Sequence, residues 1–308
     1  MTYHRMLVPL DGSELAEKAL IYAKELAGRL DLDVTLLYVC DKEEYQVLPM
    51  HRSYVERAAD LAKTQIEAVR ASTGGKSKAK AGQVVGRVTV GYPAEEILRH
   101  IDENNIDLIL MTTHGRSGIK RWVMGSVADK VLRASRVPVL LIRAGIPDDI
   151  AYDKWPKTTI LVPLDGSKLA ESVLPHAEAL AKQRGLDGAE LVLLRVTEPP
   201  TIPSDYPAAM PESWEEHVEM ETARRKRDSQ QYLAGIEKGL KDAGFNVRSE
   251  VLVGNPAEEI VGHCGRNRFS LTVIATHGRS GLSRWAYGSV AEKVLLATSC
   301  PILVVRPR

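Results

Sequence analysis

An internal repeat constrains the fold of this 308-residue chain more than any other feature. Three segments of the first half return in the second: MLVPLDGS at 6–13 as ILVPLDGS at 160–167, GYPAEEI at 91–97 as GNPAEEI at 254–260, and 113–143 at 276–306 with more than half of its residues identical. The order is the same in both halves and the period is close to half the chain. This predicts duplicated domains and not a solenoid of short units.

The length of the chain also suits two domains of ordinary size. The stretch between the repeats contains a glycine, two prolines and three aspartates, a composition typical of a linker. We therefore expect one domain over 1–145, a linker over 146–157 and a second domain over 158–308. Because the linker is short, the two domains should touch each other.

Short apolar runs alternate with longer amphipathic stretches in both halves. The expected strands are 5–10, 34–39, 84–90, 108–112 and 138–142 in the first half, and 159–164, 191–196, 247–253, 271–275 and 302–305 in the second. The expected helices of the first half are 13–27, 54–71, 93–102 and 125–134. This alternation predicts an α/β fold of two tandem, doubly wound, five-stranded parallel sheets, Rossmann-like, with helices on both faces.

The composition of the chain argues against nucleic acid and membranes as binding partners. The net charge is +1, from 41 basic and 40 acidic residues, so no long-range field would attract nucleic acid or an anionic membrane. No apolar run approaches the length of a membrane span, and the N-terminal residues do not resemble a signal peptide. The three cysteines lack a metal-type spacing and suit a reducing compartment. We expect a cytoplasmic protein that binds neither nucleic acid nor membrane.

Polar features gather where the expected strands end, which is where open parallel sheets bind ligands. They are Asp11 and Asp165 after the first strand of each half, TTHG at 112–115 and ATHG at 275–278 after the fourth strand, and GSV at 125–127 and 288–290 at the start of the last helix. Three features of this kind, each present twice, predict a ligand site in each half.

The glycine-serine pair offers the clearest chemistry. Glycine lets a ligand approach the backbone, and the free amides and dipole of a helix start attract phosphate. The serine hydroxyl can cap the helix or bond a phosphate oxygen, and Arg116 and Arg279 in the preceding loop can add charge-assisted bonds. An isolated Gly-Ser pair is more often a plain N-cap. Here it occurs together with the aspartate and the Thr-His-Gly segment in both halves, and this combination favours a phosphate site.

These residues are similar to those of the universal stress protein family, over nearly all of both halves. Nucleotide-binding members of that family carry a glycine, two residues, a second glycine, nine residues and then glycine with serine or threonine. The matching residues are Gly115, Gly125 and Ser126 in the first half and Gly278, Gly288 and Ser289 in the second. The first glycine is replaced by Thr112 and by Ala275. Because threonine is bulkier and β-branched, we expect the second half to bind more tightly.

The resemblance implies that each half binds ATP or another adenine nucleotide, which Mg²⁺ could accompany. Asp11 and Asp165 would contact the adenosine part, and Val39 and Val196 would line the adenine pocket. The expected binding residues are Pro9, Leu10, Asp11, Val39, Met111, Thr112, His114, Gly115, Arg116, Gly118, Gly125, Ser126 and Val127 in the first half, and Pro163, Leu164, Asp165, Val196, Ala275, His277, Gly278, Arg279, Gly281, Gly288, Ser289 and Val290 in the second. The alternatives are a turn or capping role for the aspartates and a plain core role for the valines.

Several catalytic motifs are absent from the sequence. It contains no phosphate loop of the Gly-x-x-x-x-Gly-Lys-Ser/Thr type, no Gly-x-Ser-x-Gly elbow, no cluster with metal spacing and no obvious general base in the motif region. We therefore expect an ATP-binding regulator of a stress response that is not an enzyme, or at most a very slow ATPase. Two alternatives stay open: a slow ATPase or nucleotidyl-transfer enzyme, and an interaction scaffold whose sites have decayed.

The last strand of each half, 137–142 and 300–305, is apolar and would lie at a sheet edge, which invites pairing. The resemblance to the universal stress protein family implies that such domains dimerise through this last strand. We expect the two halves to pair internally and antiparallel, with 139–141 near 302–304. Association of whole chains into a homodimer stays an open alternative.

Overall fold

The computed structural model describes residues 1–72, 82–113, 124–143, 146, 158–200, 212–276 and 287–307. The first repeat forms β1 (Arg5–Leu10), α1 (Glu14–Leu30), β2 (Asp33–Cys40), the 3₁₀ helix η1 (Lys42–Val47), α2 (Leu48–Ser72), β3 (Val84–Val90), α3 (Pro93–Asn104), β4 (Leu108–Thr112), α4 (Ser126–Ala134) and β5 (Val139–Ile142). The second forms β6 (Thr158–Pro163), α5 (Lys168–Glu171), α6 (Leu174–Arg184), the 3₁₀ helix η4 (Leu186–Gly188), β7 (Ala189–Thr197), α7 (Glu212–Asp242), β8 (Val247–Val253), α8 (Pro256–Arg266), β9 (Leu271–Ala275), α9 (Ser289–Ala297) and β10 (Ile302–Val305).

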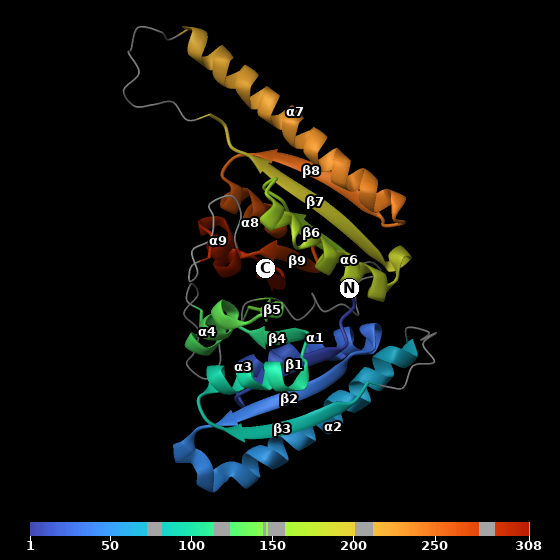
Figure 1. Cartoon of the computed structure of the whole chain (residues 1–308), viewed down its shortest axis with the longest axis vertical. Helices are drawn as coiled ribbons and strands as arrows, with labels where there is room; N and C mark the ends of the chain where they lie inside the picture. Colours follow the sequence, from blue (N-terminus) through green and yellow to red (C-terminus); the bar gives the residue numbers. More distant parts are fainter. Residues whose placement is uncertain are drawn as a thin grey trace.

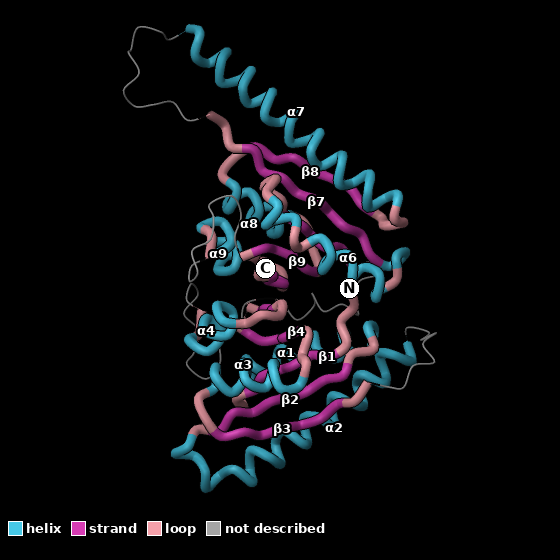
Figure 2. Tube along the Cα trace, in the orientation of Figure 1, coloured by secondary structure: helices cyan, strands magenta, loops and turns pink. Residues whose placement is uncertain are grey.

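The ten described strands form one sheet in the order β3-β2-β1-β4-β5-β10-β9-β6-β7-β8. Figure 2 shows β3 and β2 at the lower end of the molecule and β7 and β8 at the upper end. Within each half neighbouring strands run parallel, as an alternation of strands and helices requires. The chain steps outward from β1 to β3 and then returns to the other side of β1 with β4. The predicted pair of doubly wound, five-stranded α/β sheets is confirmed.

Each five-stranded sheet is covered by helices on both faces (Figure 1). The helices α1, α2, α6 and α7 pack on one face and bury one apolar core, and α3, α4, α8 and α9 bury a second core on the other face. Each core is continuous across the two halves. The short strand β5 serves both of them, because Leu140 and Ile142 face the first core and Val139 and Leu141 the second.

The two halves meet along their last strands. β10 pairs antiparallel with β5, with Leu303 opposite Leu140 at the centre of the register. Beside this pairing, the amide of Tyr3 donates to Oε1 of Gln183 at 3.0 Å, and Nε2 of Gln183 donates back to the carbonyl of Tyr3 at 2.9 Å. A guanidinium of Arg143 donates to the carbonyl of Thr298 at 2.6 Å. The seam therefore combines strand pairing with polar contacts between helices and termini.

The first helix differs between the halves. In the first half α1 is continuous, and its N-cap is Ser13, whose hydroxyl accepts a hydrogen bond from the amide of Ala16. In the second half the same stretch is split into α5 and α6. Pro175 stands there, where the repeat places Ile21, and proline has no amide hydrogen for the helix ladder.

Two helices, α2 and α7, are long. α2 begins six residues before the predicted start at 54, directly after η1, and α7 has 31 residues and projects past β7 and β8 (Figure 1). Among the described residues, no helix is both long enough and apolar enough to cross a membrane.

Candidate functional site

The strand order reverses between β1 and β4 in the first half and between β6 and β9 in the second. A ligand site in an open α/β sheet is expected at such a point, beyond the carboxyl ends of the strands. Asp11 and Thr113 directly follow the ends of β1 and β4, and Asp165 and Thr276 follow β6 and β9. The fold thus brings together two of the three features that the sequence singled out.

The aspartates stabilise a tight turn in both halves. Oδ1 of Asp11 accepts the amide of Ser13 at 3.0 Å and its hydroxyl at 2.6 Å. Oδ1 of Asp165 accepts the same groups of Ser167 at 2.9 Å and 2.6 Å. The intervening Gly166 has a φ of 87°, in the region that favours glycine. The turn role considered for these residues is therefore present, and it fixes each carboxylate at the carboxyl end of its strand.

The start of the last helix is fixed against the fourth strand. The amide of Gly125 donates to the carbonyl of Thr113 at 2.8 Å, and the amide of Gly288 donates to that of Thr276 at 2.9 Å. This contact brings the third sequence feature beside the other two.

The N-cap residue of α4 is Gly125 and that of α9 is Gly288, so the serine is the first helical residue and not the cap. Where Ser13 caps α1 and Asn255 caps α8 with a side-chain oxygen, the glycines offer none. Ser126 and Ser289 are both exposed. A helix start of this kind presents backbone amides and the positive end of the dipole, a combination that suits an anionic group.

A cavity opens at these features in the second domain, with a volume of about 1140 Å³ that includes space open to solvent. It is lined by every predicted second-half residue that the structure describes: Pro163, Leu164, Asp165, Val196, Ala275, Gly288, Ser289 and Val290. The residues predicted from the sequence therefore share one cavity, and their role in binding stays a prediction.

The cavity has further lining residues that sequence reasoning missed. They are Ala170, Leu194, Glu198, Pro256, Ile260, Ile274 and Ala291, whereas Thr276, which also lines the cavity, belongs to the ATHG segment singled out from the sequence. Pro256 and Ile260 belong to the repeated segment GNPAEEI, so its recurrence was a usable signal for a site role. Glu198 follows β7 beside a proline-rich segment, and no local pattern marked it.

The walls of the cavity are mainly apolar, and two carboxylates lie among the lining residues. Asp165 and Glu198 are acidic, and none of the described lining residues is basic. Carboxylates accept hydrogen bonds, so this part of the cavity suits a ligand moiety rich in hydroxyl or amino groups. The start of α9, which also lines the cavity, supplies positive potential there.

The first domain places its predicted residues in the corresponding positions. Leu10, Met111 and Thr112 are buried, and Pro9, Asp11, Val39, Gly125 and Val127 are half-buried. Thr112 is only 7% exposed, so its branched side chain occupies space at the end of β4 where the second domain has the methyl group of Ala275. The remaining predicted residues lie outside the described ranges: His114, Gly115, Arg116, Gly118, His277, Gly278, Arg279 and Gly281.

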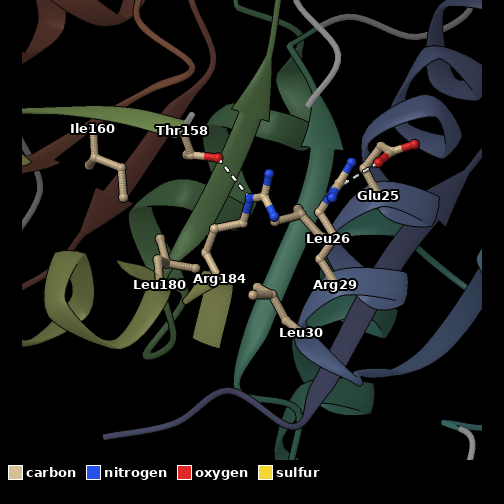
Figure 3. A pocket seen from close by; sticks show the side chains of 8 residues that line it. All are labelled: Glu25, Leu26, Arg29, Leu30, Thr158, Ile160, Leu180 and Arg184. Carbon is tan, nitrogen blue, oxygen red and sulfur yellow. Dashed lines mark hydrogen bonds and ion pairs between the residues drawn. The ribbon is translucent and has the colours of Figure 1, made fainter. Parts of the chain in front are cut away.

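A second hollow lies at the seam between the domains, and Figure 3 shows its lining. It has about 280 Å³, again with space open to solvent, and is formed by Glu25, Leu26, Arg29, Leu30, Thr158, Ile160, Leu180 and Arg184. Nε of Arg29 lies 3.1 Å from Oε2 of the buried Glu25, and Nε of Arg184 donates to Oγ1 of Thr158 at 3.0 Å. Thr158 begins β6, so this hollow lies at the amino ends of the strands, away from the candidate site.

Comparison with known proteins agrees with this architecture. The Universal stress protein family matches residues 2–143 and again 157–306. A universal stress protein of Mycobacterium tuberculosis is 24% identical over 98% of this chain and 97% of its own length. The crystal structure of a universal stress protein from Archaeoglobus fulgidus superposes with a TM-score of 0.67, at 20% identity and 99% coverage of both chains.

A universal stress protein family structure from Arabidopsis thaliana, with AMP bound, matches 49% of this chain and 92% of its own at 16% identity and a TM-score of 0.34. The Mycobacterium tuberculosis protein and the Archaeoglobus fulgidus structure both match over the two halves of the chain, and the family model matches each half in turn. The chain therefore belongs to the universal stress protein family and carries two domains of that family in tandem.

Proposed function

We propose that each domain binds an adenine nucleotide, ATP first among them, at the carboxyl ends of its strands. The observation that carries this proposal is the cavity of the second domain, where apolar walls, two carboxylates and a glycine-capped helix start face one space. An adenine nucleotide has the complementary parts: a flat apolar base, ribose hydroxyls that donate hydrogen bonds, and anionic phosphates.

The residues suggest an orientation for the ligand. The base would lie against Val196 and Leu164, and the ribose hydroxyls or the adenine amino group would donate to Asp165. The phosphates would lie over the start of α9, at Gly288 and Ser289, where the backbone amides and the helix dipole favour negative charge. Mg²⁺ could accompany the phosphates. In the first domain Val39, Leu10, Asp11, Gly125 and Ser126 would take these roles.

We propose further that bound nucleotide acts as a signal and is not consumed quickly. Fast hydrolysis needs a base placed to activate water, and Oδ1 of Asp165 is already engaged by Ser167. Nucleotide would then act on the segments 112–124 and 275–287, most of whose residues lie outside the described ranges, and partner proteins in a stress response would read that state. The two domains, which the proposed linker 146–157 connects, pair through their last strands, and this pairing would hold the two sites at a fixed separation.

A slow ATPase is the second candidate, and Glu198 is the observation that favours it, because this carboxylate lines the cavity. Phosphate release by the purified protein, compared with that of Glu198→Gln, separates the two candidates. A regulator gives equal, background rates for both proteins. An ATPase that uses Glu198 as a base loses its turnover in the variant.

The direct test of binding is whether nucleotide accompanies the protein. The purified chain is denatured and the released small molecules are identified by mass spectrometry. We expect an adenine nucleotide, reduced in amount when Asp165 is changed to Asn. Protein that carries none, and that takes up none when ATP is added, would remove the proposal.

A further inference from the structure

Two of the three cysteines of the chain lie together in the core of the second domain. Cys264 is near the end of α8 and Cys300 stands two residues before β10, and both are almost fully buried. The hydroxyl of Thr272 on β9 lies between them, 3.6 Å from Sγ of Cys264 and 3.1 Å from Sγ of Cys300. Thr298 adds a second hydroxyl 3.5 Å from Sγ of Cys300.

The first domain provides an internal comparison for this cluster. The repeat places Ile101, Ile109 and Val137 where the second domain has Cys264, Thr272 and Cys300. Ile101 and Ile109 are buried in the same core, and Val137 packs against it. The fold is therefore satisfied by aliphatic side chains at all three positions. Two thiols and a bridging hydroxyl are a property of the second domain alone, and packing does not require them.

The two thiols are chemically unequal. A hydrogen bond from the Cys300 thiol, against the effect of burial, lowers the pKa of Cys264 to about 7. The threonine hydroxyls act in the same direction on Cys264. The same contact and burial raise the pKa of Cys300 well above its ordinary value. Thiolate is the reactive form of cysteine, and the directions of the two pKa shifts favour it at Cys264 over Cys300.

We propose that Cys264 and Cys300 form a peroxide-sensitive dithiol that closes to a disulfide within the second domain. Sγ of Cys264 attacks one oxygen of hydrogen peroxide, the O–O bond breaks, and a sulfenic acid and one water result. Sγ of Cys300 then attacks that sulfur, its proton leaves with the hydroxyl group as a second water, and the S–S bond forms. Two thiols are oxidised and one peroxide is reduced.

The disulfide would link a helix that covers the sheet to the strand that joins the two domains. It would fix the end of α8 to the residue that precedes Pro301 and β10, the strand that pairs with β5 at the seam. The thiols already share Thr272, so closure asks for a short side-chain movement and not a rearrangement of strands. The inference does not depend on nucleotide binding.

The test treats the reduced full-length chain with hydrogen peroxide, blocks the remaining thiols with an alkylating agent and analyses the digest by mass spectrometry. We expect a peptide pair linked through Cys264 and Cys300, which separates on reduction, while Cys40 is recovered alkylated. Cys40 is equally buried and lies in the first domain, so it controls for general unfolding.

Matched variants sharpen the result. Cys300→Val installs the residue of the first domain, so the variant should fold; we expect no linked peptide and an accumulation of Cys264 sulfenic acid, trapped with dimedone. Thr272→Val should slow closure several-fold. Absence of the linked pair in the folded protein, or equal sulfenic acid at Cys264 with and without Cys300, would overturn the proposal.

Discussion

The amide of Gly288 donates a hydrogen bond of 2.9 Å to the carbonyl oxygen of Thr276. This bond fixes the start of α9 at the end of β9, directly beside the turn of Asp165. The same bond joins Gly125 to Thr113 in the first domain, at 2.8 Å. A helix start, a strand end and an aspartate turn are thereby held at one point of each sheet, and the proposed phosphate position follows from that arrangement.

Replacing Gly288 with valine should weaken ATP binding to the second domain by about tenfold, equivalent to about 1.4 kcal/mol. The φ of Gly288 is −60°, which any residue adopts, so the variant should fold normally and the loss should come from blocked approach of the ligand. Calorimetric titration with ATP measures the effect. Gly235→Ala, on α7 with open space around the added methyl group, is the control and should bind like the parent. A Gly288→Val protein with undiminished affinity would place the phosphates elsewhere.

The two sites should differ in affinity, with the second domain tighter. Buried Thr112 places a branched side chain where Ala275 has a methyl group. Asp11→Asn and Asp165→Asn each silence one site and keep an oxygen that can accept from the turn serine, so the titration of each variant reports the other domain. Thr112→Ala should raise the affinity of the first site toward that of the second. Equal sites in the parent, or a tighter first site, would show this idea to be wrong.

Strong alkali should weaken the seam. Burial, and secondarily the charge of Asp107, raise the pKa of Tyr3, whose hydroxyl lies 2.7 Å from Nδ1 of His176. In the unfolded chain tyrosine ionises near pH 10, below the pKa of Tyr3 in the folded chain. The contribution of the protonated Tyr3 hydroxyl to the stability of the fold is therefore fully present below about pH 10 and is lost as the pH rises further.

Urea unfolding at pH 8 and pH 11 measures the effect. Tyr3→Phe should lower the free energy of unfolding by about 1 kcal/mol at pH 8 and reduce its fall toward pH 11. The exposed Tyr45→Phe is the control and should change neither value. A Tyr3→Phe protein whose stability falls with pH as steeply as that of the parent would assign the alkaline sensitivity to other groups.

The antiparallel pairing of β5 with β10 should trap a cross-link within one chain. Leu140 and Leu303 oppose each other and face the same core, so cysteines at these two positions should form a disulfide in a background without the native cysteines. Val139 and Leu303 face opposite cores, and the corresponding pair should not link. After cleavage in the linker, the linked halves should still migrate together without reductant. Links that form only between chains would point to a dimer in place of internal pairing.

Much of the fold was predictable because its signals are local. Buried parallel strands read as short apolar runs, and the predicted 5–10, 108–112, 271–275 and 302–305 agree with β1, β4, β9 and β10. The split of α5 from α6 has a local signal as well, because Pro175 stands there where the first half has Ile21. The six earlier residues of α2 were missed because Pro49 and polar neighbours interrupt the helical pattern there.

The site was predictable in part. Asp165, Gly288 and Ser289 stood out because they recur in order, and the fold brings them to one cavity. Glu198 could not be found in this way, because its place in the cavity depends on where β7 ends relative to α8, which is a relation between distant segments. The role of Ser289 was equally hidden: whether the serine or the glycine caps the helix is decided by a single backbone dihedral.

The measurement that tests the account most directly is a calorimetric titration of the full-length chain with ATP and Mg²⁺, paired with a phosphate-release assay on the same sample. We predict saturable binding that weakens about tenfold at both sites when Gly125 and Gly288 are both replaced by valine, and turnover well below about one per second. No binding to the folded chain, or hydrolysis at or above that rate, would contradict the account.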